Sequence, residues 1–372
     1  MPKYQWNYQE IKENRNTLQQ MYHEELDITE KENIKEIIEM YDNMLSLMFK
    51  TSNNYINDDC CFDDIKNFLD NQLMSYQYSD ISIINMLLHS YLPFKNVYTP
   101  TDYPTDIPII ATNDELITIV NDFIHKMIPN NIQENFIESL NKYNNIHLTY
   151  NIQNRDYGGI TLLDSFLNKK YIYVARDNHL MDIIKLPHEL FHYVFCDCDV
   201  FTPCNYSTYY LSEIEGSFAN ILFGDYYYKQ ATINPNFFNL NFLKLYNDHI
   251  EAIVTNNALL DSVSNNKIRM NKLNKYLNYF GLPTFQNPTE IVDYLSTPLE
   301  ILIKYAFGYL IAIDLYTMYQ NDPEFSFYLL KNLKFIKREN DIVHLLRNNH
   351  ITFMDDDYEN LKKYTKKIER QN

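Results

Sequence analysis

The chain has 372 residues, of which 45% are hydrophobic and 22% charged, the balance of an ordinary folded protein rather than of a disordered chain or a membrane bundle. Its 49 acidic and 32 basic residues give a formal charge of −17, which repels nucleic-acid phosphates and anionic membranes. We therefore expect no nucleic-acid partner and no membrane partner.

The cysteines and the hydrophobic segments indicate a compartment. The five cysteines are an odd number in a chain long enough to fold without disulfides, so we expect a reducing cytoplasm. Residues 1–16 lack the apolar segment of a signal peptide, and charged residues interrupt the apolar stretch 299–319. We expect neither a signal peptide nor a transmembrane helix.

The periodicity of apolar residues predicts a mainly helical protein. Intervals of three and four residues over residues 9–140 are typical of amphipathic helices. Over residues 147–177 the period changes to two, which predicts two strands with a turn at Gly158 and Gly159. Helical spacing then returns from Met181 onward, and the charged end of the chain is expected to be a solvated helix end.

We expect three regions from this pattern. They are an N-terminal helical lobe over residues 1–140, a central domain over residues 141–340 and a C-terminal helical tail over residues 341–372.

An H-E-x-x-H sequence follows the second predicted strand. It comprises His188, Glu189 and His192, and chance alone would produce such a match roughly 0.015 times in a chain of this composition. Residues four apart share one face of a helix, so both histidines can bind one Zn²⁺. Glu189 is then placed to accept a proton from a water molecule that the metal activates. The pattern predicts a metallopeptidase; the alternative is a pair of helical histidines that only pack.

A catalytic zinc site needs a third protein ligand. The nearest downstream carboxylates are Glu213 and Glu215 in a second predicted helix, where Gly216 would allow a close approach of backbones. Ser212 and Glu215 also fit a capping box, which gives Glu215 another role. We favour Glu213, and Glu215 remains an alternative.

Cys196, Cys198 and Cys204 follow the histidines. Their spacing matches no tetrahedral zinc pattern, and we interpret them as free thiols.

Three segments resemble the zinc oligopeptidases related to thimet oligopeptidase and oligoendopeptidase F. Residues 171–176 and 184–192 are similar to that family's edge strand and H-E-x-x-H helix. Residues 213–218, Glu-Ile-Glu-Gly-Ser-Phe, resemble the helix that carries the glutamate ligand, and residues 304–310 resemble a late helix that supplies tyrosine. The chain is shorter than typical members, and Phe191 stands where the family often has glycine.

The resemblance implies a mainly α, zincin-like helical two-lobed clamshell with a small β-sheet beside the H-E-x-x-H helix. It implies an endopeptidase that hydrolyses internal bonds of short or unstructured peptides with one zinc ion per chain. His188, His192 and Glu213 would be the zinc ligands and Glu189 the general base. Tyr309, or else Tyr305, would donate a hydrogen bond to the oxyanion.

The strand at residues 171–175 is expected to be the edge strand to which an extended substrate adds. Two alternatives to a general oligopeptidase stay open. One is a processing peptidase dedicated to one peptide or regulator, and the other is an inactive peptide-binding protein of the same fold.

Overall fold

The computed structural model describes residues 4–49, 65–78, 81–100, 107–109, 111–150, 158–195, 210–264, 267–295, 297–335, 346–351 and 357–371. The chain forms two compact units, which we call unit 1 (residues 1–56 and 104–203) and unit 2 (residues 57–103 and 204–372). Each unit combines two separate stretches of sequence. The expected domains 1–140, 141–340 and 341–372 do not coincide with these units, and they remain a prediction.

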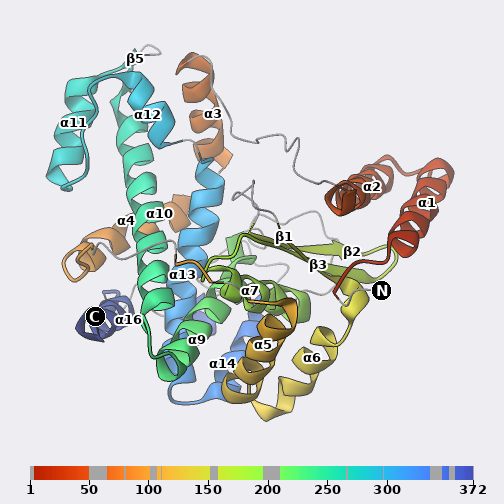
Figure 1. Ribbon diagram of the computed structural model, residues 1–372. Helices are drawn as coiled ribbons and strands as arrows, with labels where there is room; N and C mark the ends of the chain where they lie inside the picture. The colour runs from red at the N-terminus through yellow and green to blue at the C-terminus, as the bar shows by residue number, and fades with distance from the viewer. Residues whose placement is uncertain are drawn as a thin grey trace. The chain divides into compact units, whose positions relative to one another are not determined.

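The described residues are mainly helical, as predicted, and a small sheet lies beside the H-E-x-x-H helix (Figure 1). Unit 1 contains α1 (Tyr8–Glu24), α2 (Ile28–Phe49), α5 (Asn113–Met127), α6 (Asn130–Leu140), η1 (Tyr143–Asn145), β1 (Ile146–Tyr150), β2 (Gly159–Asp164), β3 (Lys169–Arg176) and α7 (Asp182–Phe195).

The sheet of unit 1 has the strand order β1-β3-β2, with β1 parallel and β2 antiparallel to β3. Its topology corrects two expectations. β3 pairs on both sides, so residues 171–175 are not an edge strand. Gly159 begins β2 instead of forming a turn. The two edge strands of this sheet are β1 and β2, and beside β1 Leu148 N donates to Tyr4 O at 3.2 Å.

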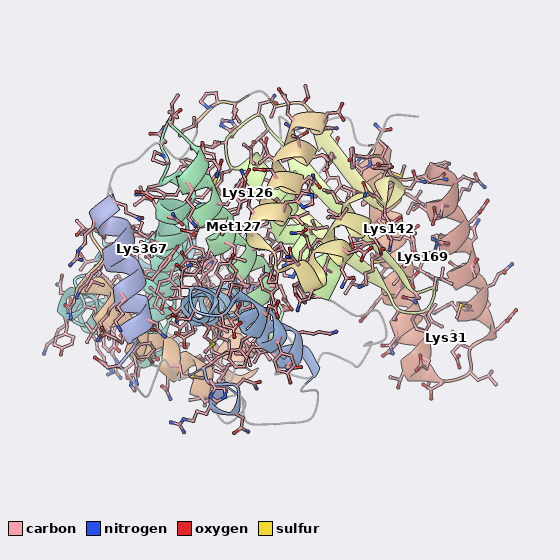
Figure 2. The ribbon with its side chains drawn as sticks, turned by 90° about the horizontal axis from the view of Figure 1, so that it is seen from below. Lys31, Lys126, Met127, Lys142, Lys169 and Lys367 are labelled. Atoms are coloured by element: carbon pink, nitrogen blue, oxygen red, sulfur yellow. The ribbon has the colours of Figure 1, made fainter. Side chains whose placement is uncertain are left out.

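The two faces of this sheet carry different layers. Tyr171, Tyr173 and Ala175 of β3 pack with α1 and α2 in one core cluster that includes Trp6 and Tyr41. Alternate residues of a strand point to opposite faces, and α7 packs on the other face against β2 and β3, with α5 and α6 beyond it (Figure 1). Figure 2 labels Lys169, the first residue of β3, whose Nζ pairs with the carboxylate of Glu10 in α1 at 2.9 Å.

His147 is a buried titratable group in the layer with Trp6. It is 7% exposed, stacks on Tyr173, and its Nδ1 accepts a hydrogen bond from Trp6 N at 3.4 Å. Burial lowers the pKa of His147 to about 4 from its usual 6.5. In the unfolded chain the ring protonates near pH 6.5, whereas in the folded protein it stays neutral down to about pH 4. The contribution of neutral His147 to the free energy of unfolding is therefore fully present above pH 6.5, and it is lost as the pH falls from 6.5 to about 4.

We expect His147→Phe to weaken the acid sensitivity of unit 1. Between pH 7 and pH 4.5, its free energy of unfolding should fall by about 2–3 kcal/mol less than that of wild type. Trp6 is the chain's single tryptophan and contacts His147, so its fluorescence during urea titration reports on this unit. Equal pH dependence in the two proteins would show that His147 is not the acid-sensitive group.

In the residues that the structure describes, unit 2 is helical except for a two-stranded ribbon, which the sequence did not predict. It contains α3 (Ile65–Tyr78), α4 (Ile81–Lys95), α9 (Ile214–Gln230), α10 (Phe237–Ser262), β4 (Val263–Ser264), β5 (Lys267–Ile268), α11 (Met270–Tyr279), α12 (Pro288–Tyr294), α13 (Leu299–Tyr319), α14 (Pro323–Phe335) and α16 (Glu359–Gln371).

The core of unit 2 is built around α13, which packs against α9, α10 and α14. α13 is the one described helix that is long and apolar enough to cross a membrane, by length and composition alone. Its most apolar window is 72% buried inside the protein, as in the central helix of a folded core. The predicted absence of a transmembrane helix remains a prediction.

The C-terminal helix α16 is not the purely solvated end that we expect from its charge. Leu361, Tyr364, Thr365 and Ile368 are buried, and the Tyr364 hydroxyl donates to Asn239 Oδ1 at 3.3 Å. The spacing of these four residues places them on one face of the helix, so α16 packs against the rest of unit 2 along a buried stripe.

Candidate active site

α7 carries the H-E-x-x-H sequence, and buried polar contacts fix its start. Asp182, 2% exposed, accepts hydrogen bonds from the backbone N–H groups of Asp177 and Asn178 at 3.0 and 2.9 Å. Lys185 Nζ lies 2.9 Å from Asp182 Oδ1 and 2.9 Å from Ala175 O. These contacts hold the loop between β3 and α7, and burial together with the neighbouring Asp182 raises the pKa of Asp177.

His188 and His192 lie one turn apart on α7. Their Nε2 atoms are 3.2 Å apart, with His192 9% exposed and His188 half-buried. Two nitrogens bound to one zinc ion at about 2.0–2.1 Å in a tetrahedron would be roughly 3.3 Å apart. The pair is therefore spaced as two ligands of one metal ion are.

The side chain of Glu189 extends from α7 toward β2, and 6% of the surface of Glu189 is exposed. The Thr161 hydroxyl of β2 is 2.7 Å from Glu189 Oε2 and 2.9 Å from the Glu189 backbone oxygen, and it can donate to either. The carboxylate is thus held from the sheet.

Glu213 immediately precedes α9 in unit 2 and is 7% exposed. A Cβ atom on Gly308 of α13 would lie 3.0 Å from the backbone oxygen of Glu213, so a larger residue would require one of the two backbones to shift. Lys304, one turn earlier on α13, places its Nζ 2.8 Å from Glu213 Oε1. Gly308 therefore leaves room for the Glu213 backbone, and Lys304 balances the charge of the Glu213 carboxylate.

His188 and His192 belong to unit 1 and Glu213 belongs to unit 2, so the histidine pair stands on the structure of unit 1 and Glu213 as the third ligand remains a prediction. The choice between Glu213 and Glu215 as the third ligand remains a prediction as well. The capping box is not formed as predicted, since Glu213, not Ser212, is the N-cap residue of α9. Two imidazoles and one carboxylate are a donor set that suits zinc and leaves a fourth position open.

The two tyrosines that the resemblance implicates differ in exposure. Tyr309 is 4% exposed, its ring packs on Phe242, and burial raises its pKa. Tyr305 is half-buried, and Lys304 Nζ lies 5.1 Å from the centre of its ring. The ring of His249 packs against both tyrosines, and burial lowers its pKa. A donor for an oxyanion needs access to substrate, so the exposure favours Tyr305, although both roles remain predictions.

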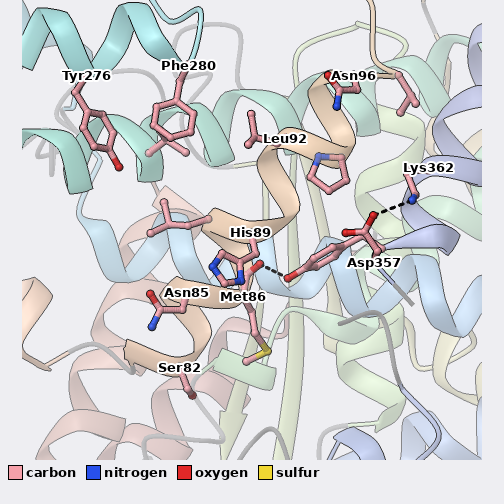
Figure 3. Close-up of a pocket in the computed structure, with 15 residues that line it drawn as sticks. Ser82, Asn85, Met86, His89, Leu92, Asn96, Tyr276, Phe280, Asp357 and Lys362 are labelled. Atoms are coloured by element: carbon pink, nitrogen blue, oxygen red, sulfur yellow. Dashed lines mark hydrogen bonds and ion pairs between the residues drawn. The ribbon is translucent and has the colours of Figure 1, made fainter. Parts of the chain in front are cut away.

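A cavity of about 1040 Å³ lies in unit 2 between α4, α11 and α16 (Figure 3). His89, Tyr276 and Phe280 are among its lining residues, and Lys362 at its rim pairs with Asp357. None of the predicted site residues lines it. Cys196, Cys198 and Cys204 lie outside the described residues, so their interpretation as free thiols stays a prediction.

Comparison with known proteins gives a likeness of fold. No known protein family and no curated protein matches the chain at a significant level. Among solved structures, a candidate peptidase from Chlamydophila abortus is similar over 98% of this chain and 62% of its own, with 13% identity and a TM-score of 0.54. Two candidate oligoendopeptidase F structures, one from Bacillus anthracis, give TM-scores of 0.49 and 0.48 at 11% and 12% identity over 92% of this chain and 66% and 65% of theirs.

The likeness to the Chlamydophila protein shows that this chain shares the fold of that protein. At 13% identity it shows the fold alone, and the chain spans 62% of the length of that protein. Activity and substrate must therefore be argued from the residues of this chain.

The structure adds three residues that the sequence did not single out for these roles. Thr161 contacts Glu189, Lys304 pairs with Glu213, and Gly308 makes room for the Glu213 backbone. For Gly308 the sequence did contain a signal, because an isolated glycine inside a helical pattern is unusual in a chain with only 6 glycines. No local pattern marks Thr161 or Lys304, because their partners are distant in the sequence. Glu189 lies 28 residues after Thr161, and Glu213 lies 91 residues before Lys304.

Proposed function

We propose that this chain is a zinc-dependent endopeptidase that hydrolyses internal bonds of short or unstructured peptides, acting in the cytoplasm. The observation that carries the proposal is the spacing of the His188 and His192 Nε2 atoms, which lie 3.2 Å apart on one turn of α7, as two ligands of one metal ion do. The fold shared with the candidate peptidase from Chlamydophila abortus supports it.

His188, His192 and Glu213 would hold the zinc ion. When bound, the ion supplies a Lewis acid that polarises the scissile carbonyl and lowers the pKa of water. Glu189 would take the proton of the attacking water on its carboxylate and pass it to the leaving amine. Tyr305 or Tyr309 would donate to the oxygen on which negative charge develops.

As an edge strand of the described sheet, β2 offers a place for the substrate. An extended peptide that adds to a sheet edge is held by backbone hydrogen bonds, whatever its side chains. β2 also carries Thr161, which contacts Glu189, so a peptide paired with this strand would run beside the general base.

The test is metal analysis of the purified protein, followed by cleavage of a mixed peptide library. We expect about one zinc per chain and cleavage at internal bonds that stops with a chelator and returns with added zinc. Zinc without cleavage would favour an inactive peptide-binding protein. Cleavage of a single peptide in the library would favour a dedicated processing enzyme. If the protein neither binds zinc nor cleaves any peptide, the two histidines serve only in helix packing.

A further inference from the structure

The face of β2 that lies against α7 meets the carboxylate of Glu189 at two points. Thr161 Oγ1 lies 2.7 Å from Glu189 Oε2. A Cβ atom added to Gly159 would lie 2.7 Å from both Cγ and Oε1 of Glu189. Residues 159 and 161 share this face because alternate residues of a strand point the same way.

Gly159 is needed here for space rather than for backbone conformation. It pairs with Val174 within a regular antiparallel ladder, where any residue can adopt the backbone angles. Real Cβ atoms essentially never come within 3.0 Å of such neighbours, so any larger residue would displace the Glu189 side chain. The missing side chain leaves room beside Oε1, while Thr161 occupies Oε2.

A free glutamate side chain rotates about three bonds, and a general base works only within hydrogen-bond reach of the proton that it accepts. A donor at one oxygen and a narrow space at the other restrict that rotation. Among the described residues, Thr161 is the side chain that donates to this carboxylate, and it leaves Oε1 as the oxygen able to accept a proton.

We propose that Thr161 and Gly159 are positioning residues that hold the Glu189 carboxylate in the orientation of a general base. Thr161 does so by its hydrogen bond to Oε2, and Gly159 by leaving room for Cγ and Oε1. This inference rests on the proposed function, because it takes Glu189 as the base.

The kinetic test compares Thr161→Val, which keeps the shape but loses the hydroxyl, with Thr161→Ser, which keeps the hydroxyl. In the zinc-loaded full-length protein we expect Thr161→Val to lower kcat about 10- to 100-fold, with KM within about twofold and zinc still about one per chain. Thr161→Ser should recover most of that loss. Gly159→Ala should lower kcat to a similar extent.

A matched control is Leu162→Val, on the opposite face of β2 in the cluster with α1 and α2. It disturbs the same strand without touching Glu189, so kcat should stay within about twofold of wild type. If Thr161→Val leaves kcat unchanged, or if Thr161→Ser and Leu162→Val lose as much as Thr161→Val, the positioning role is wrong.

A second measurement needs no activity. In metal-free protein, the melting temperatures of wild type, Thr161→Val, Glu189→Leu and the double variant form a cycle. We expect the two single effects to deviate from additivity by roughly 2 °C. Additive effects would overturn the inference even for an active enzyme. Non-additive effects in a protein that never shows zinc-dependent cleavage would overturn the proposed function instead.

Discussion

Glu189→Gln is expected to lower kcat by about 10²- to 10⁴-fold while zinc stays at about one per chain. Glutamine keeps the shape of the side chain and an oxygen that can accept the Thr161 hydrogen bond, so the 6% exposed site should remain packed. It cannot accept a proton at neutral pH, so the water would lose its base. The measurement is kcat on a fluorogenic peptide cleaved by wild type, with the zinc content of the same sample.

Two controls make this result specific. The melting temperature of Glu189→Gln should be close to that of wild type, and the variant should still bind the peptide, because Glu189 is not one of the proposed zinc ligands. If variant and wild type cleave the peptide equally fast, the catalytic role of Glu189 is wrong, and the activity belongs to another site or to a contaminant.

The sequence predicted the local part of the candidate site. His188 and His192 lie on one helical face because the four-residue spacing matches one helical turn, which requires no knowledge of the tertiary structure. The mainly helical fold was predicted for the same reason, since the 3.6-residue period is a local property. The buried stripe of α16 also had a local signal, in the spacing of Leu361, Tyr364 and Ile368, but the charge of the segment obscured it.

The order of the strands could not be predicted. Alternation shows that a segment is a strand but not which strand it pairs with, and β3 has the same pattern whether it is central or at an edge. Gly158 and Gly159 were interpreted as a turn because glycine most often serves that purpose. The actual constraint on Gly159 is the side chain of Glu189, which lies 30 residues later in the sequence. No pattern near Gly159 indicates this contact.

The pairing of Glu213 with Lys304 is a charge contact that the sequence did not predict. Lys304 Nζ lies 2.8 Å from Glu213 Oε1, and this cation balances the carboxylate charge of a residue that is 7% exposed. A divalent ion and an ammonium group would both be attracted to the same carboxylate. The zinc affinity of the site should therefore depend strongly on the charge of Glu213.

Glu213→Gln is expected to weaken zinc binding by more than about 100-fold, because even residues that only support a metal ligand contribute 10- to 100-fold. The amide is a poorer ligand than a carboxylate, and it leaves the Lys304 ammonium without its counter-charge, so the ion is also repelled. The dissociation constant for zinc can be measured by competition with a chromogenic chelator, in the same buffer for each variant.

The matched control is Glu215→Gln, which removes one carboxylate of the same helix at a residue that is 1% exposed. Because Glu213 is the proposed third ligand, the substitution of Glu215 should change zinc affinity by less than about threefold. The opposite result, with affinity lost in Glu215→Gln and kept in Glu213→Gln, would make Glu215 the third ligand. Loss in neither variant would mean that the two histidines bind zinc with a ligand from another part of the chain.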